Sequence, residues 1–193
     1  MEKEIKKVGS HVLIIAPHGG NLEAGTTELT KYISNHHHYD YYSFTVLRKY
    51  HVEDLHVTSG HYDDSQLLNM VKSKDFAVSI HGAKGSRPIV YIGGLDASLK
   101  DALKQQLTRH HFVVKNAPSY LGGDLKKNFI NRDFKSKGVQ LELTTALRKS
   151  MFVNENSSHQ SRKDKSNRSP VMYQFSDAIH LAIKEVDDSG KDR

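Results

Sequence analysis

Two histidines in this chain each stand where a strand-like apolar run ends and a glycine follows. His18 closes the run "VLIIAP", and His81 closes the run "FAVSI". Glu23 lies five positions after His18, and on a continuous helix side chains at that separation point about 140° apart. The intervening Gly19 and Gly20 allow a tight turn instead, which can bring the imidazole and the carboxylate together.

Two imidazoles and one carboxylate, with a fourth position left for water, form the donor set of catalytic zinc sites. The chain contains no cysteine, so a metal site must use His, Asp, Glu or backbone oxygens. His18, Glu23 and His81 are therefore candidate ligands for one Zn²⁺ ion. A simple turn after each strand would produce the same spacing, and the spacing alone leaves both interpretations open.

Glu142 lies in the segment "VQLEL", where apolar residues alternate with Gln140 and Glu142. One interpretation is a strand whose polar positions face solvent. The other is a partly buried carboxylate beside the metal site, where it takes a proton from water and returns it to the leaving amine. Both interpretations fit the alternation.

Three further residues are candidates for binding a substrate carboxylate. Asn131 and Arg132 stand in "NFINRDF", shortly before Glu142. Arginine presents a planar fork that binds carboxylates through two hydrogen bonds, and an adjacent asparagine can add another. Arg87, in "GAKGSRPIV", is another candidate anion contact. The alternative for both arginines is an ordinary surface position in a loop.

Short apolar or β-branched runs predict strands, and helical periodicity predicts helices between them. The expected strands cover residues 12–16, 43–47, 76–80, 89–92, 112–115 and 138–143, and the expected helices cover residues 27–34, 65–72, 97–108 and 172–186. This alternation predicts an α/β fold, a three-layer sandwich with a mixed, largely parallel central sheet. Ligands of such folds bind beyond the carboxyl ends of the strands, where His18, His81 and Glu142 are expected.

A chain of 193 residues fits one domain, and we predict a single catalytic domain over residues 1–193. The polar, Ser-rich segment 154–170 predicts a flexible basic loop, and residues 187–193 predict a frayed tail. No apolar run has the length of a transmembrane helix, and the charged N-terminus lacks the apolar segment of a signal peptide. The sequence leaves localisation unknown, with cytoplasmic synthesis and release by lysis as one route.

The formal net charge is +6 and the pI is about 9.3, which favours a polyanionic partner or describes a soluble protein that happens to be basic. The thirteen histidines cluster partly in "NHHHYD" and "RHHF", which we expect to be solvated surface. The pattern shows no obvious excess of apolar surface, so we expect a monomer.

Six segments, taken together and in order, resemble the poly-γ-glutamate hydrolases of bacteriophages and their bacterial relatives. They are "APHGGNLEAGTTEL", "DLHVTSGHYDD", "SIHGAKG", "VYIGG", "INRDFKSKGVQLELT" and "LRKSMF". The resemblance runs over residues 12–152 and implies a zinc-carboxypeptidase-like fold. It also implies that His18, Glu23 and His81 bind zinc and that Glu142 is the general base and acid.

The same resemblance implies that the pair Asn131 and Arg132 forms a clamp for a substrate carboxylate. His56, Tyr62 and Tyr91 fall in matching segments without an assigned role. One departure concerns the turn after His18. A third glycine followed by Ile-Glu-Pro-Gly is expected in the family, whereas this chain has "NLEAG". The ligand spacing is kept, and the difference concerns the shape of the turn and the substrate preference.

The activity implied by the resemblance is zinc-dependent hydrolysis of the γ-glutamyl amide bonds of poly-γ-glutamate, which for a phage degrades the capsule of its host. A related zinc amidohydrolase of a small N-acyl amino acid or γ-glutamyl peptide would present the same residues. A basic nucleic-acid-binding protein is the other alternative, but few aromatic residues accompany the basic segment "SRKDKSNR". We therefore expect neither a nucleic-acid nor a membrane partner.

Overall fold

A computed structural model describes residues 2–47 and 63–191 of the chain. Its centre is one seven-stranded sheet in the order β1-β3-β2-β4-β7-β5-β6. The strands are β1 (Glu2–Lys6), β2 (Val12–Gly20), β3 (Asp40–Val46), β4 (Phe76–Ala83), β5 (Ile89–Gly94), β6 (Val113–Asn116) and β7 (Val139–Thr144). All of the expected strands are therefore present, and β1 is an addition.

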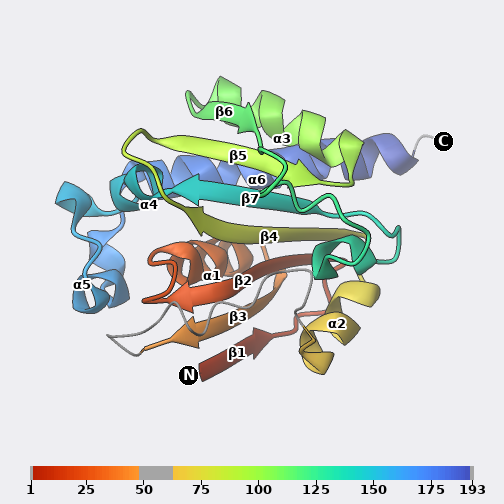
Figure 1. Cartoon of the computed structure of the whole chain (residues 1–193), viewed down its shortest axis with the longest axis horizontal. Helices are drawn as coiled ribbons and strands as arrows, with labels where there is room; N and C mark the ends of the chain where they lie inside the picture. Colours follow the sequence, from red (N-terminus) through yellow and green to blue (C-terminus); the bar gives the residue numbers. More distant parts are fainter. Residues whose placement is uncertain (1, 48–62, 192–193) are drawn as a thin grey trace.

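The four central strands β3, β2, β4 and β7 run parallel, with their carboxyl ends at the same edge of the sheet (Figure 1). Strands β5 and β6 are parallel to each other but antiparallel to β7, and β1 is antiparallel to β3. The sheet is mixed and largely parallel, as the sequence predicted. Every residue of β2 is buried, because both faces of this central strand are covered.

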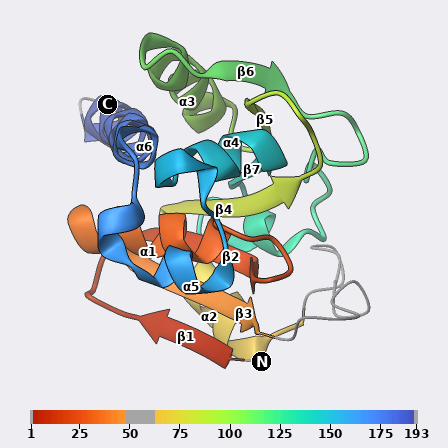
Figure 2. The same cartoon turned by 90° about the vertical axis from the view of Figure 1, so that its left-hand side faces the viewer.

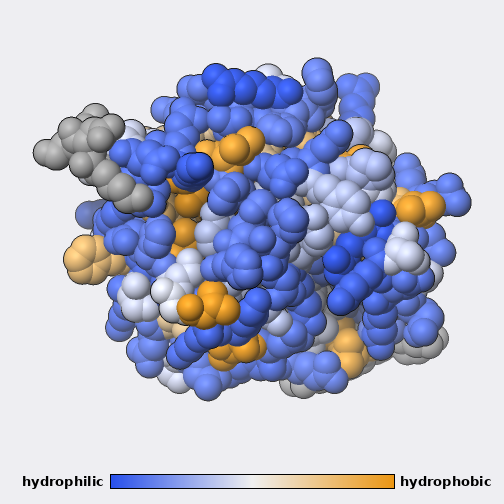
Figure 3. Space-filling model, turned by 180° about the vertical axis from the view of Figure 1, so that it is seen from behind, coloured by the Kyte–Doolittle hydropathy of each residue, from blue (hydrophilic) through white to orange (hydrophobic). Residues whose placement is uncertain are grey.

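Helices cover one face of the sheet more completely than the other (Figures 1 and 2). Helices α1 (Thr26–His36), α3 (Ala97–Arg109) and α6 (Pro170–Lys191) pack on one face, and α2 (Ser65–Lys72) and the 3-10 helix η3 (Phe129–Arg132) pack on the other. Their apolar sides point inward, so the surface seen from behind is mostly hydrophilic with scattered apolar residues (Figure 3). These layers form the three-layer α/β sandwich.

Helix α6 shows how apolar spacing gives this packing. Met172, Phe175, Ile179 and Ile183 recur at helical spacing, and all are buried in the core of the larger face. The helix is longer than the predicted 172–186. It begins at Pro170, since proline is tolerated in the first turn, and it continues to Lys191. The predicted tail is therefore helical over residues 187–191.

The segment 154–170, predicted to be a flexible loop, is instead folded. It contains α5 (His159–Lys163) and η5 (Lys165–Asn167) and begins within η4 (Val153–Glu155). Its polar residues cap these helices: the Ser158 side chain accepts a hydrogen bond from Ser161 N, and the Asp164 side chain accepts one from Ser166 N. The segment 154–170 therefore forms short helices although its sequence shows no apolar periodicity.

One further helix, α4 (Thr145–Ser150), follows β7 directly, and the Thr144 side chain caps it. Within residues 2–47 and 63–191, no helix is both long enough and apolar enough to cross a bilayer.

Candidate active site

The candidate site forms where β2 separates from β4. The two strands pair from Val12 with Phe76 to Ile15 with Ser79, and β2 then shifts its register against β3 between Ala16 and Gly19. Such irregularities redirect the side chains that follow. The carboxyl end of β2 therefore carries its polar residues into the space beside β4.

The glycine turn predicted after His18 is present and is sterically required. Gly20 has a φ of 72°, and a Cβ there would lie 2.4 Å from the carbonyl oxygen of Val46. The turn is closed by a hydrogen bond of 2.9 Å from Glu23 N to His18 O. It places Nδ1 of His18 3.1 Å from Oε1 of Glu23, so the two side chains meet as the sequence predicted.

His81, on β4, completes a group of three potential metal ligands. One ligand atom from each of His18, Glu23 and His81 lies within 4.8 Å of the others. The exposed fractions of the three residues are only 2%, 6% and 3%. Ligand atoms around a tetrahedral zinc ion are about 3.4 Å apart, given bonds near 2.1 Å, so modest side-chain adjustment would close the group around one ion. The donors present fit zinc.

Glu23 is held by a second contact from β4. Its Oε2 accepts a hydrogen bond of 2.9 Å from Gly82 N, a residue beyond the last pairing of β4 with β2. Glycine at position 82 leaves room for Arg148, because an added Cβ would lie 2.8 Å from the guanidinium carbon of that residue. The glycine after His81 therefore serves packing and carboxylate binding rather than a turn.

Glu142 lies next to His81, since the two residues are register partners in the parallel pair β4 and β7. It is 4% exposed, so the solvent-facing interpretation of its strand is wrong. Burial raises its pKa to about 8, and the negative charge of Glu23 adds to this effect. A hydrogen bond of 3.0 Å from Gln140 Nε2 to Glu142 Oε1 acts in the opposite direction.

A buried arginine that the sequence analysis did not single out joins the parts of this site. Arg148, on α4, donates from Nε to Leu143 O (3.1 Å) and from Nη1 to Ala24 O (2.6 Å). A longer contact of 3.4 Å runs from Nη2 to Ala83 O. One guanidinium thus connects the ends of β7 and β4 with the loop that carries Glu23. Its charge also faces Glu23 and Glu142.

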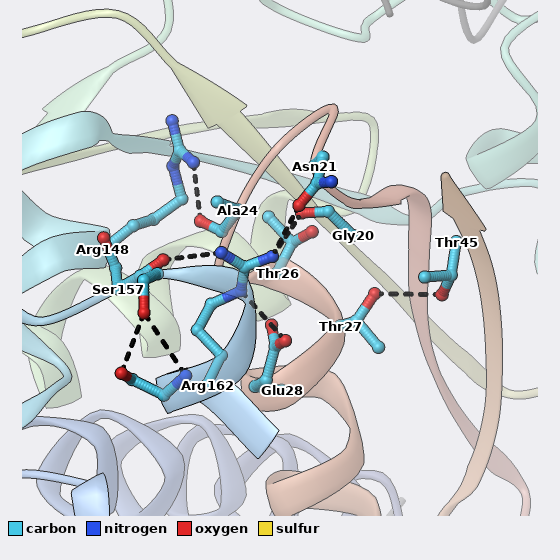
Figure 4. A network of polar contacts seen from close by, with 12 residues as sticks. Gly20, Asn21, Ala24, Thr26, Thr27, Glu28, Thr45, Arg148, Ser157 and Arg162 are labelled. Atoms are coloured by element: carbon cyan, nitrogen blue, oxygen red, sulfur yellow. Dashed lines mark hydrogen bonds and ion pairs between the residues drawn. The ribbon is translucent and has the colours of Figure 1, made fainter. Parts of the chain in front are cut away.

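A second arginine holds the outer side of the same loop (Figure 4). Arg162, on α5, donates from Nη2 to Gly20 O at 3.1 Å and to Asn21 Oδ1 at 3.2 Å, and its Nε pairs with Glu28 at 3.0 Å. Figure 4 shows Arg148 and Arg162 reaching the loop from different elements. The only sequence signal for Arg148 was its place in "LRKSMF", and Arg162 lay in a segment predicted to be flexible.

Asn131 does not have the free polar atoms that a substrate clamp needs. It is 3% exposed, and its Nδ2 donates to Gly123 O and Leu125 O. Its Oδ1 accepts from Leu95 N and Gly138 N, so the main chain uses all of its hydrogen-bonding capacity. Gly138 also precedes Glu142 by four strand residues, a distance of about 13 Å. The substrate role predicted for Asn131 is at odds with this geometry.

Arg132 is likewise not brought to the metal-ligand group. It ends η3, which packs against α2 and beside the amino-terminal part of β7, and its Nη2 donates to Lys127 O at 2.7 Å. Arg87 is placed differently. It is exposed in the turn after β4, and its carbonyl accepts a hydrogen bond from Thr144 Oγ1 at the end of β7. Of the predicted anion contacts, Arg87 is the one at the edge that holds His81.

Tyr91 is the register partner of Glu142 on β5 and is half-buried. It therefore flanks Glu142 on the side opposite to His81. His56 and Tyr62 lie outside the described residues.

Comparison with known proteins identifies the class to which this fold and site belong. The chain is a member of the poly-gamma-glutamate hydrolase family, whose profile matches residues 1–178. The SPbeta prophage-derived UPF0714 protein YoqZ of Bacillus subtilis (strain 168) is 35% identical over 147 residues, which cover 75% of this chain and 53% of that protein. The chain thus spans about half the length of this curated relative.

Two solved structures share the fold. A bacteriophage poly-gamma-glutamate hydrolase superposes with a TM-score of 0.89 at 28% identity, covering 96% of this chain and 88% of the other. The zinc-free apo form of YndL superposes with a TM-score of 0.86 at 29% identity, covering 95% and 89%. The predicted family and fold class are confirmed.

Proposed function

We propose that this protein is a zinc-dependent hydrolase that cleaves the γ-glutamyl amide bonds of poly-γ-glutamate. The observation that carries the proposal is the buried group His18, Glu23 and His81 with the carboxylate of Glu142 on the neighbouring strand position. Membership of the poly-gamma-glutamate hydrolase family and the similarity to the bacteriophage enzyme support the substrate.

In this proposal His18, Glu23 and His81 hold the zinc ion. When bound, the ion supplies Lewis-acid chemistry: it acidifies a water molecule and polarises an amide carbonyl. Hydrogen bonds within the protein orient Glu23 and its loop before any metal binds. The hydrogen bond from Gly82 N fixes one oxygen of Glu23 and leaves the other directed toward His18. The three carbonyl contacts of Arg148 keep the Glu23 loop against the ends of β4 and β7.

Glu142 is the proposed proton carrier. Burial and the repulsion from Glu23 favour its protonated form when no cation is present. A divalent cation beside both carboxylates would offset this repulsion and favour the ionised form, which is the form a general base needs. Glu142 then accepts a proton from the attacking water and delivers it to the leaving nitrogen. Gln140 keeps the carboxylate oriented through its amide group.

The substrate carries one free α-carboxylate per glutamate and is therefore a polyanion. The formal charge of +6 favours its approach, and this attraction weakens as salt is added. Arg87 is the proposed local contact for a substrate carboxylate, because it is exposed at the edge that holds His81. Each amide bond of this polymer is formed by the side-chain carboxyl group of a glutamate, so the enzyme does not need to recognise an ordinary peptide backbone.

The decisive experiment follows the length of poly-γ-glutamate chains by size-exclusion chromatography during incubation with the purified protein. We expect long chains to shorten, chelator to stop the reaction, and added zinc to restore it. Shortening that persists after complete metal removal would overturn the metal role. Intact polymer together with turnover of a small N-acyl amino acid or γ-glutamyl peptide would instead establish the small-substrate alternative.

A further inference from the structure

A second group of metal-ligating side chains lies away from the candidate active site. His36 and His37 stand at the carboxyl end of α1, and Asp177 stands on α6. One ligand atom from each of these three residues lies within 4.8 Å of the others. The histidine-rich segment "NHHHYD" was expected to be merely solvated surface. The structure instead joins it to a carboxylate from a distant part of the chain.

The spacing of the donors suits a tetrahedral ion. Nε2 of His37 is 3.6 Å from Oδ1 of Asp177, and ligand atoms around zinc are about 3.4 Å apart. The rings of His36 and His37 lie nearly perpendicular, at 77°, with centroids 4.7 Å apart. Two imidazoles and one carboxylate thus converge from two helices, and the exposed position of His36 leaves access for an ion from solvent.

His37 is held in place by its surroundings. Its side chain is only 10% exposed, and the ring of His180 stacks on it at 4.1 Å with an interplanar angle of 2°. His180 is itself fixed by a hydrogen bond of 2.6 Å between its Nδ1 and the hydroxyl of Tyr39. A parallel stacked ring does not share an ion in the plane of its neighbour, so His180 positions His37 and is not a fourth ligand.

His36 is oriented in a similar way. Its ring stacks on Tyr32 at 5.4 Å and 12°, and Tyr32 contacts Tyr173 of α6 at 5.0 Å. Aromatic contacts therefore restrict both imidazoles before any ion binds. Such restriction lowers the conformational entropy that binding must remove.

The carboxylate of Asp177 and the end of helix α1 both favour a cation at this position. The carboxyl end of α1 carries the negative end of the helix dipole, and the helix ends at His36, with His37 as its cap residue. Two cations lie nearby: Lys184 interacts electrostatically with His180, and Arg168 lies over the ring of Tyr32 at 5.2 Å from its centroid.

We propose that His36, His37 and Asp177 form a second zinc site that links the carboxyl end of α1 to α6. Imidazole and carboxylate donors suit Zn²⁺ and related divalent transition metals. The same helix α1 starts just after Glu23 and ends at this site. The ion would act as a structural link between two helices that already pack together. This site does not depend on the proposed hydrolase function.

The first test measures zinc stoichiometry. Metal-free protein is dialysed against buffered zinc, and bound metal is counted by mass spectrometry. We expect about two ions per chain in the unchanged protein and about one in His36→Ala or Asp177→Asn. These two side chains are at least partly exposed, so their replacement leaves the core intact. A matched control is the double variant His110→Ala and His111→Ala, which alters another histidine pair at a helix end and should keep both ions.

The second test uses stability and removes the candidate active site from the measurement. In a His81→Ala background, zinc should still raise the melting temperature, by about 2–5 °C at saturating metal. Adding Asp177→Asn to that background should abolish the rise. The same number of bound ions with and without Asp177→Asn, or an unchanged zinc response after Asp177→Asn in the His81→Ala background, would overturn the second site. Hydrolysis by His36→Ala should equal that of the unchanged protein.

Discussion

Among the described residues, two groups of two histidines and one carboxylate bring their ligand atoms within 4.8 Å of one another, in different surroundings. The group His18, Glu23 and His81 is buried at the carboxyl ends of parallel strands, and Glu142 lies beside it. The group His36, His37 and Asp177 lies at the surface between two helices, enclosed by aromatic rings. Donor type is thus common to both, and the neighbouring groups differ.

This difference is the reason why we propose catalysis at the first group and only metal binding at the second. The buried group has beside it a carboxylate of raised pKa, which we propose as the proton carrier. A backbone N–H fixes the carboxylate of Glu23, and a buried arginine connects three segments around it. The surface group lies at a helix end among aromatic rings, and no additional carboxylate joins its ligand set among the described residues. Burial makes the first group costly to assemble, since buried charges must be compensated.

The largest contrast should come from removing one carboxylate charge at each group. Glu142→Gln should lower poly-γ-glutamate cleavage by about 10²–10⁴-fold, because it removes the proton carrier and keeps the shape. Asp177→Asn should leave cleavage unchanged. Steady-state rates of chain shortening, with zinc content measured in parallel, test both. Substantial turnover by Glu142→Gln with zinc still bound would disprove the assigned base.

A smaller effect is expected at Arg148, which supports the buried group without belonging to its ligand set. Arg148→Lys keeps the charge but has one donor nitrogen in place of the three that bond separate carbonyls, so Glu23 should be held less firmly. We expect about 10–100-fold weaker zinc affinity at that group. Zinc titrations at fixed pH measure this, and Lys149→Gln, an exposed neighbour on α4, is the matched control. Equal affinities for Arg148→Lys and the control would remove Arg148 from its positioning role.

The smallest effect concerns the stability of the metal-free protein. The pKa of Glu142 is about 8 in the folded protein and near its ordinary value of 4.5 when unfolded. Between these values the folded state binds more protons, so stability falls as pH rises from about 4.5 to 8. Glu142→Gln lacks this titration and should gain about 3 kcal/mol relative to the unchanged protein between pH 5 and pH 8.

Urea unfolding in the presence of chelator at several pH values measures the difference in free energy of unfolding between Glu142→Gln and the unchanged protein. Saturating zinc should reduce this stability difference, because the cation offsets the repulsion between Glu23 and Glu142. A difference that does not change with pH would show that Glu142 titrates normally in the folded protein.

Much of the fold and the central part of the site were predictable from the sequence. Apolar runs located six of the seven strands, and helical spacing located α1, α2, α3 and α6. The edge strand β1 was missed because "EKEIK" has one apolar residue and depends on pairing with β3. His18, Glu23 and His81 were found because strand ends and glycines are local signals. Membership of the family was likewise evident from six short segments.

What the sequence determined is therefore which residues follow the strands, since a run of apolar residues and the glycine after it are visible over a few positions. Only the tertiary structure decided which polar groups those residues meet. Arg148 donates a hydrogen bond to Ala24, 124 positions away in the sequence, and Arg162 donates one to Gly20, 142 positions away. The side chain of Asn131 instead bonds main-chain groups. Asp177 reaches His37 in the same way. Such partners are chosen by the packing of the layers, because a hydrogen bond depends on proximity in space and leaves no local trace in the chain.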